Sequence, residues 1–176
     1  MKKPLETIDA LAQAGCEDVH LVMVGPEDDC TVAECQQRAD ELGLGDRVQV
    51  LGSVYGAEKE SILLGADAYI SLSIRENFGH TAAESLAAGV PVILSPGNDL
   101  SPELAVRDCG WFLVSDDAKE AVAAIQAFAG TNDGDLQAMG LRGRDFIAEE
   151  CSFESFKNTL LTLKAEAIQA QQSKTR

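Results

Sequence analysis

The chain has 176 residues, of which 45% are hydrophobic and 24% are charged, a balance typical of a globular α/β domain. Its net charge is −15 and its Lys and Arg residues are scattered, which excludes sequence-independent binding to nucleic acid or anionic lipid. The five cysteines lack the spacing of a disulfide framework or a zinc site, and the N-terminus lacks an apolar targeting segment. We therefore expect one soluble, cytoplasmic domain over residues 1–176, with reduced thiols.

Short β-rich runs alternate with longer amphipathic stretches along the chain. Strands are expected at 19–25, 48–52, 68–73, 91–94 and 110–114, and helices at 4–14, 31–42, 57–65, 79–88, 102–107, 118–129, 133–149 and 153–172. We expect Thr31 to cap its helix in a capping box with Glu34, and Gly43 to follow the end of that helix. The alternation predicts a Rossmann-like fold, a parallel sheet with helices on both faces and a helical C-terminus.

Ligands of such folds bind beyond the carboxyl ends of the strands. The segments in that position are 25–27, 52–54, 73–79 and 95–98. The third segment leads into a helix whose residues are almost all small or apolar, so we expect this helix to be buried on most sides. Its exceptions, Thr81, Glu84 and Ser85, are spaced to form one polar stripe.

The start of this helix has the chemistry of a phosphate site. A helix N-terminus presents free N–H groups and partial positive charge, so Gly79, His80 and Thr81 could hold a diphosphate. A carboxylate on a buried helix needs hydrogen-bond donors, and ribose hydroxyls would serve Glu84. Glu76 would then face whatever the diphosphate carries. The pattern predicts a nucleoside diphosphate that bears a polyhydroxyl group.

The run E-N-F-G-H-T-x-x-E-S-L-A-A-G-V-P-V-I, which begins at Glu76, resembles the Glu-x7-Glu motif of retaining GT-B glycosyltransferases. The resemblance is closest to glycosyltransferase family 4, the glycosyl transferases group 1. Four further runs occur in family order, namely V-x-L-V-x-V-G, D-R-V-x-V-L-G, A-D-A-Y-I-S-L-S and C-G-W-F-L-V. The resemblance implies the C-terminal, donor-binding Rossmann-like domain of a GT-B enzyme.

By this resemblance, each candidate residue has a separate role toward a nucleoside-diphosphate sugar. Glu84 should bind the ribose hydroxyls, Glu76 should orient the donor sugar, and Lys3 should neutralise the diphosphate leaving group. The resemblance places the backbone amides of Asn77, Phe78 and Gly79 close to the sugar. It places His80 and Thr81 close to the phosphates, and the backbone of Ser53 and Val54 at the base.

The implied reaction is sugar transfer from the nucleotide sugar to an acceptor with retention at the anomeric carbon. No metal and no other cofactor is expected, because Lys3 and the helix terminus would stabilise the leaving group. In the family, an N-terminal acceptor domain precedes this domain, and a central strand ending in a Gly-Arg turn precedes the Lys3 helix; neither is present. We therefore expect a domain with little activity alone, and a homodimer through exposed sheet edges as one possible compensation.

Other interpretations start from single residues. Glu84 alone would be a solvated helix residue, His80 a loop or cap residue and Arg75 a surface charge. Two other functions stay open: a truncated, non-catalytic module for nucleotide binding or assembly, and a fragment of a nucleotide-sugar epimerase, which the Glu-Asn-Phe-Gly spacing disfavours. Gly25-Pro26 lacks the G-x-G-x-x-G pattern of a nicotinamide dinucleotide site.

Overall fold

A computed structural model describes residues 2–174 and confirms the predicted α/β fold class. The elements are α1 (Pro4–Ala14), β1 (Leu21–Val24), α2 (Val32–Glu41), β2 (Val48–Gly52), α3 (Gly56–Leu64), β3 (Tyr69–Ser71), α4 (His80–Ala87), β4 (Val92–Leu94), α5 (Ser101–Ala105), β5 (Gly110–Phe112), α6 (Ala118–Ala129), α7 (Asp133–Glu150) and α8 (Phe153–Lys174). Each falls within three residues of its predicted bounds, so the alternation predicts every element.

Local signals in the sequence set the ends of α2 as predicted. The Thr31 side chain accepts a hydrogen bond from the Glu34 backbone N–H at 3.2 Å, and the Glu34 carboxylate accepts one from the Thr31 backbone N–H at 2.8 Å. Both bonds of the capping box are therefore present. Gly43, just past the end of the helix, has a φ of 71°, the left-handed conformation that favours glycine.

The strands form two parallel sheets rather than one. β1 pairs with β2, with Leu21 opposite Val48, and β4 lies between β3 and β5. In the Rossmann strand order 3-2-1-4-5-6, two strands lie on one side of position 1 and three on the other. The division into β1–β2 and β3–β4–β5 corresponds to those two groups. It falls where the family resemblance places the central strand.

Helices cover both faces of the strands, and β4 shows how. Ile93 joins a core cluster with Ile8 and Leu11 of α1, whereas Val92 and Leu94 join a second cluster with Leu86 of α4. Successive side chains of a strand point to opposite faces, so one face of β4 meets α1 and α6, and the other meets α4, α5 and α7. The first cluster also includes residues of β1 and β2, so the two sheets share one apolar layer.

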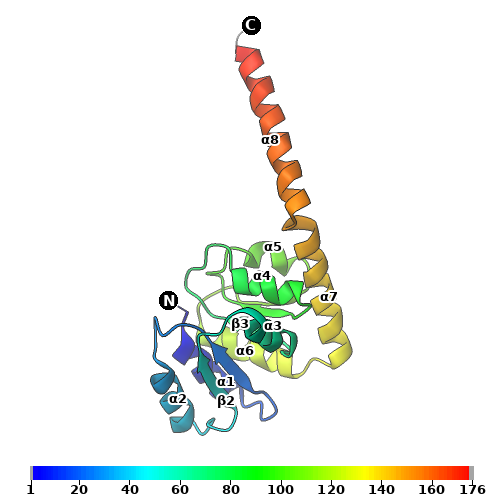
Figure 1. Ribbon diagram of the computed structural model, residues 1–176. Helices are drawn as coiled ribbons and strands as arrows, with labels where there is room; N and C mark the ends of the chain where they lie inside the picture. Colours follow the sequence, from blue (N-terminus) through cyan, green and yellow to red (C-terminus); the bar gives the residue numbers. More distant parts are fainter. Residues whose placement is uncertain (1, 175–176) are drawn as a thin grey trace.

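The C-terminal helix α8 projects away from the body of the molecule (Figure 1). The large apolar side chains in the first half of this helix are exposed, namely Phe153, Phe156, Leu160, Leu161 and Leu163. Within residues 2–174, neither α8 nor any other helix combines the length and the apolar character that crossing a membrane requires.

All five cysteines are free thiols, as the sequence predicted. Burial raises the pKa of the Cys30 thiol to about 12 and that of Cys109 to about 11. Both thiols are therefore protonated at neutral pH.

Candidate functional site

The loop from β3 to α4 ends at a glycine that the structure requires. Gly79, the N-cap of α4, has a φ of 69° and a ψ of 51°, in the left-handed region that other residues rarely adopt. A Cβ atom at this position would also lie 2.5 Å from Nδ2 of Asn98. Conformation and close approach thus both exclude a side chain at the position where the sequence predicted contact between backbone and phosphate.

Backbone hydrogen bonds fix the position of Glu76. Its N–H donates to the Gly97 carbonyl at 2.7 Å, and its carbonyl accepts from the Asp99 N–H at 3.2 Å. The two loops thereby extend the parallel pairing of β3 and β4 beyond the ends of the strands. The backbone of Glu76 is held by the segment that follows β4, which is the last of the four strand-end segments singled out in the sequence.

Buried hydroxyl groups hold the same two loops together. The Ser95 hydroxyl donates to the Ser73 carbonyl at 2.6 Å, and the Ser101 hydroxyl donates to the Ser95 carbonyl at 2.9 Å. The hydroxyls of Ser71 and Ser73 are 3.1 Å apart. All four serines are buried, so their hydrogen bonds are shielded from water. The strand ends around Glu76 are therefore rigid.

Asn98 and Gly97 complete this connection. The Asn98 side chain is buried, and its Oδ1 accepts a hydrogen bond from the Leu100 N–H at 3.1 Å. Gly97 packs so closely that a Cβ there would overlap the carbonyl oxygens of Ser73 and Ile74. The sequence marked this segment by its position after β4 but gave no role to either residue.

Lysines at the start of α1 meet the strand-end loops. Lys2 forms an ion pair with Glu76 through its Nζ, and its backbone N–H donates to the Asp29 carboxylate. Lys3 Nζ lies 3.1 Å from Asp116 Oδ1, and its side chain is only 16% exposed. The loops after β1, β3 and β5 therefore converge on residues 2 and 3. Lys2, to which the sequence assigns no role, contacts Glu76, while Lys3 contacts Asp116.

The first turn of α4 lies next to Glu76. The first N–H groups of a helix have no acceptor within the helix, so those of His80 and Thr81 are available to a ligand. The rings of Phe78 and His80 pack edge to face, with their centroids 5.2 Å apart. Both side chains belong to exposed residues, as does Asn77, and Thr81 is half-buried.

Tyr69 of β3 lies below this turn. Burial raises its pKa above the usual value near 10, and the charges of Glu76 and Glu84 raise it further, while the Ser71 and Thr81 hydroxyls partly offset the increase. The phenol is therefore neutral, within reach of the electrostatic field of both candidate carboxylates.

The surroundings of Glu84 differ from the expected buried stripe. Its side chain is 48% exposed and forms an ion pair with Lys59 of α3. Ser85, expected on the same polar stripe, is fully buried, and its hydroxyl donates to the Thr81 carbonyl at 2.7 Å. The stripe prediction was wrong for Ser85, because this bond one turn back satisfies the hydroxyl inside the buried face. Glu84 instead faces solvent and α3.

Ser53 and Val54 lie between β2 and α3. Ser53 is exposed, Val54 is half-buried, and the preceding Gly52 accepts a hydrogen bond through its carbonyl from the Gly25 N–H at 2.8 Å. Helix α3 follows directly and reaches α4 through the pair of Lys59 and Glu84. The structure thus places α3, which follows the turn predicted to contact the base, next to Glu84, which is predicted to contact the ribose. The sequence carried no signal for Lys59 or Asp116, since each pairs with a distant residue.

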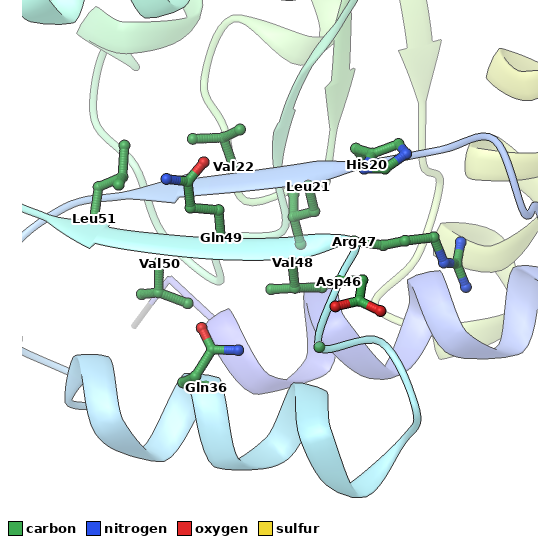
Figure 2. Close-up of a pocket in the computed structure, with 11 residues that line it drawn as sticks. His20, Leu21, Val22, Gln36, Asp46, Arg47, Val48, Gln49, Val50 and Leu51 are labelled. Atoms are coloured by element: carbon green, nitrogen blue, oxygen red, sulfur yellow. The ribbon is translucent and has the colours of Figure 1, made fainter.

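A hollow of about 440 Å³ lies elsewhere, along β1 and β2 (Figure 2). Gln36 of α2 and residues of both strands line it, and none of the predicted site residues does. Arg47 at its end donates to the carbonyl oxygens of Cys16 and Val19, at 2.6 and 3.2 Å, so its charge serves the local backbone. In the part of the chain described, no three His, Cys, Asp or Glu side chains gather in a way suited to a metal ion.

The family model described as "Glycosyl transferases group 1" matches residues 1–144. A curated relative, the GDP-mannose:cellobiosyl-diphosphopolyprenol alpha-mannosyltransferase of Xanthomonas campestris, is 31% identical over 149 residues, which are 82% of this chain and 38% of the relative. The D-inositol 3-phosphate glycosyltransferase of Mycobacterium marinum is 31% identical over 75% of this chain and 28% of its own length. The chain thus spans about a third of the curated relatives that it matches.

A solved structure gives the same picture of the fold. The C-terminal domain of the glycosyl transferase group 1 family protein LpcC from Francisella tularensis matches with a TM-score of 0.72 and 20% identity, over 86% of this chain and 80% of that domain.

Proposed function

We propose that this chain, which belongs to the glycosyl transferases group 1 family, binds the nucleotide-sugar donor of a retaining glycosyltransferase. The observation that carries the proposal is the arrangement around α4. Glu76 is fixed in the loop before the helix, Gly79 opens the helix in a left-handed conformation, and Glu84 lies on its solvent face. Free N–H groups that can bind a diphosphate thus lie between two carboxylates, and each carboxylate can accept hydrogen bonds from hydroxyl groups of the ligand.

In this proposal, each residue takes the role that the family resemblance implies. Glu84 binds the ribose hydroxyls, and the N–H groups at the start of α4, with His80 and Thr81, hold the diphosphate. Glu76 orients the sugar, next to the amides of Asn77 and Phe78. The backbone of Ser53 and Val54 contacts the base, on the side of the site where α3 begins.

In this proposal, Lys3 and the helix terminus stabilise the diphosphate as the bond from the anomeric carbon to the phosphate oxygen breaks. The acceptor hydroxyl attacks on the same face, gives its proton to an oxygen of the departing diphosphate and forms the new glycosidic bond, so configuration is retained. No metal is required, because the cationic and N–H groups offset the charge of the leaving group. Lys3 must exchange Asp116 for the diphosphate when the donor binds.

We propose that residues 1–176 form a single donor-binding domain in the cytoplasm, and that the acceptor is held by a separate N-terminal domain, as expected for a GT-B enzyme. The share of each relative that the chain spans supports this division. Alone, the chain should bind the donor and transfer sugar slowly or not at all. Efficient turnover by the isolated chain would contradict the division.

Binding can be tested by thermal unfolding in the presence of GDP, UDP, GDP-mannose and UDP-glucose. A relative named for GDP-mannose and a neighbour solved with UDP, Anabaena Alr3699/HepE, suggest these probes. A ligand at 100 times its dissociation constant should stabilise the fold by about 2.7 kcal/mol. Glu84→Gln should remove most of this stabilisation, whereas Glu154→Gln, on the distant α8, should not. No shift with any of the four compounds would contradict the proposal.

One observation favours a second function. β1–β2 and β3–β4–β5 are separate sheets, and the strand edges at such a division can pair with another chain. The chain could then act as an assembly module that forms a homodimer through these edges. Light scattering decides this: a dimer that no nucleotide stabilises would favour the module, whereas a monomer that GDP or UDP stabilises would favour donor binding.

A further inference from the structure

The pair formed by Lys59 and Glu84 joins two elements that approach the proposed nucleoside from different sides. Lys59 belongs to α3, and Glu84 lies on the solvent face of α4. None of the residues of α3 is buried, so apolar packing holds this helix only weakly. The ion pair is therefore a specific link between the helix that follows Ser53 and Val54 and the carboxylate assigned to the ribose.

The pair leaves the carboxylate open to a ligand. Lys59 contacts Oε2 of Glu84, whereas an ionised carboxylate has acceptor positions for about four hydrogen bonds. The side chain of Glu84 is about half exposed, so the remaining acceptor positions face solvent. Two ribose hydroxyls can therefore bind the carboxylate without displacing Lys59.

The pair also restricts the motion of Glu84. A half-exposed glutamate has three rotatable side-chain bonds, and ordering such a side chain on binding reduces affinity. In the absence of ligand, Lys59 already holds the carboxylate over α4. Lys59 is the charged group that contacts the Glu84 carboxylate, so the pair determines where this carboxylate lies.

We propose that Lys59 is a positioning residue for the ribose of the donor: it orders the Glu84 carboxylate for the 2′ and 3′ hydroxyls and holds α3 against the site. This inference rests on the proposed function. It gives Lys59 an effect that depends on the ligand hydroxyls, unlike a general attraction between a cation and a diphosphate.

The test compares two ligands and four proteins by isothermal calorimetry. The ligands are GDP or UDP, whichever binds the natural chain more tightly, and the 2′,3′-dideoxy form of the same nucleotide. The proteins are the natural chain, Lys59→Met, Lys59→Arg and the control Lys157→Met. Lys157 forms a comparable exposed pair with Glu154 at 3.2 Å, but on α8.

Lys59→Met should weaken binding of the ribose nucleotide by about threefold to tenfold, the range expected when one long side chain must be ordered anew. It should change binding of the dideoxy nucleotide by less than about twofold. Lys59→Arg should retain most of the affinity, and Lys157→Met should change neither value. Melting temperatures of the four proteins serve to confirm that each is folded.

Equal weakening for both nucleotides would overturn the inference, because it would show a general charge effect. Unchanged or tighter binding by Lys59→Met would overturn it as well, because Lys59 would then contribute nothing to binding or would compete with the ligand for Glu84. In these cases the natural chain still binds and the proposed function stands. If the natural chain binds neither GDP nor UDP, both the proposed function and this inference fail.

Discussion

The sheet β1–β2 and the sheet β3–β4–β5 support their strand ends in different ways. After β1 the chain has open space, and a Cβ added to Gly25 would meet no atom within 4 Å. After β4, a Cβ added to Gly97 would overlap the carbonyl oxygens of Ser73 and Ile74, and the Ser95 hydroxyl donates a hydrogen bond to the first of these. The first sheet depends on its apolar contacts with α1 and α2, whereas the second adds a buried polar network at the end where ligand is expected.

This difference shows where rigidity is concentrated. A fully satisfied, buried hydrogen-bond network holds loops in one geometry, and here it holds the loop that carries Glu76. The lysines that meet Glu76 and Asp116 come instead from the start of α1, where the Lys2 side chain is 62% exposed. The site thus combines a fixed backbone at Glu76 with an exposed, adjustable cation at Lys2.

The largest expected effect comes from the glycines that follow β1 and β4. Gly97→Ala should destabilise the fold by about 3 kcal/mol and abolish nucleotide binding, because the backbone around Ser73 and Ile74 must move. Gly25→Ala should change stability by less than about 0.5 kcal/mol, since its surroundings are open. Urea denaturation of both variants measures this. Equal effects would show that the two sheets do not differ in the way described.

A smaller effect is expected from the buried hydroxyl of Ser95. Ser95→Ala should cost about 1–2 kcal/mol, because the buried Ser73 carbonyl loses its hydrogen bond, and it should also weaken nucleotide binding. Thr31→Ala should cost about 1 kcal/mol through loss of the α2 cap, but leave binding unchanged. Denaturation of both variants measures the loss of stability, and calorimetry measures nucleotide binding separately. Unchanged binding by Ser95→Ala would disconnect the network from Glu76.

The smallest expected effect is on the pH dependence of stability. Glu34, at the start of α2, and Glu120, in α6, both contribute to it. The pKa of Glu34 is lowered mainly by the Thr31 backbone N–H, and that of Glu120 mainly by the Ser115 hydroxyl, from an ordinary value of 4.5. Because the folded-state pKa is the lower one, each contributes stability that is present above pH 4.5 and lost as the pH falls through the folded value. Glu34→Gln and Glu120→Gln should each make the decrease in melting temperature between pH 6 and pH 3 less steep. An unchanged slope in both would contradict these assignments.

Most of the fold could be predicted from the sequence, because its signals are local. The alternation of strands and helices placed every element, and Thr31, Glu34 and Gly43 set the ends of α2 through contacts only a few residues apart. The loop from Ser73 to Gly79 was found for the same reason, since it follows a strand and opens a helix. The division into two sheets was not predicted, because the family resemblance implied only exposed sheet edges.

The contacts within the site could not be predicted in this way. Lys2 meets Glu76 across 74 positions, and Lys59 meets Glu84 across 25, and no periodicity connects such residues. Ser85 was misplaced because helical spacing alone does not show which edge of α4 is buried, nor that its hydroxyl can be satisfied within the helix. The Asn98 side chain fits in its buried position because Gly79, next to it, has no Cβ atom.

Helix α8 has a consequence for how the molecule melts. Its 22 residues span about 33 Å at 1.5 Å per residue, and its apolar side chains from Phe153 to Leu163 lie largely in solvent. A helix whose apolar side chains lie in solvent gains little stability from tertiary packing, so α8 should unwind gradually on heating, separately from the cooperative transition of the body. Circular dichroism at 222 nm should therefore report a sloping loss of helix at low temperature, while fluorescence of Trp111, in the sheet, should report a single sharp step.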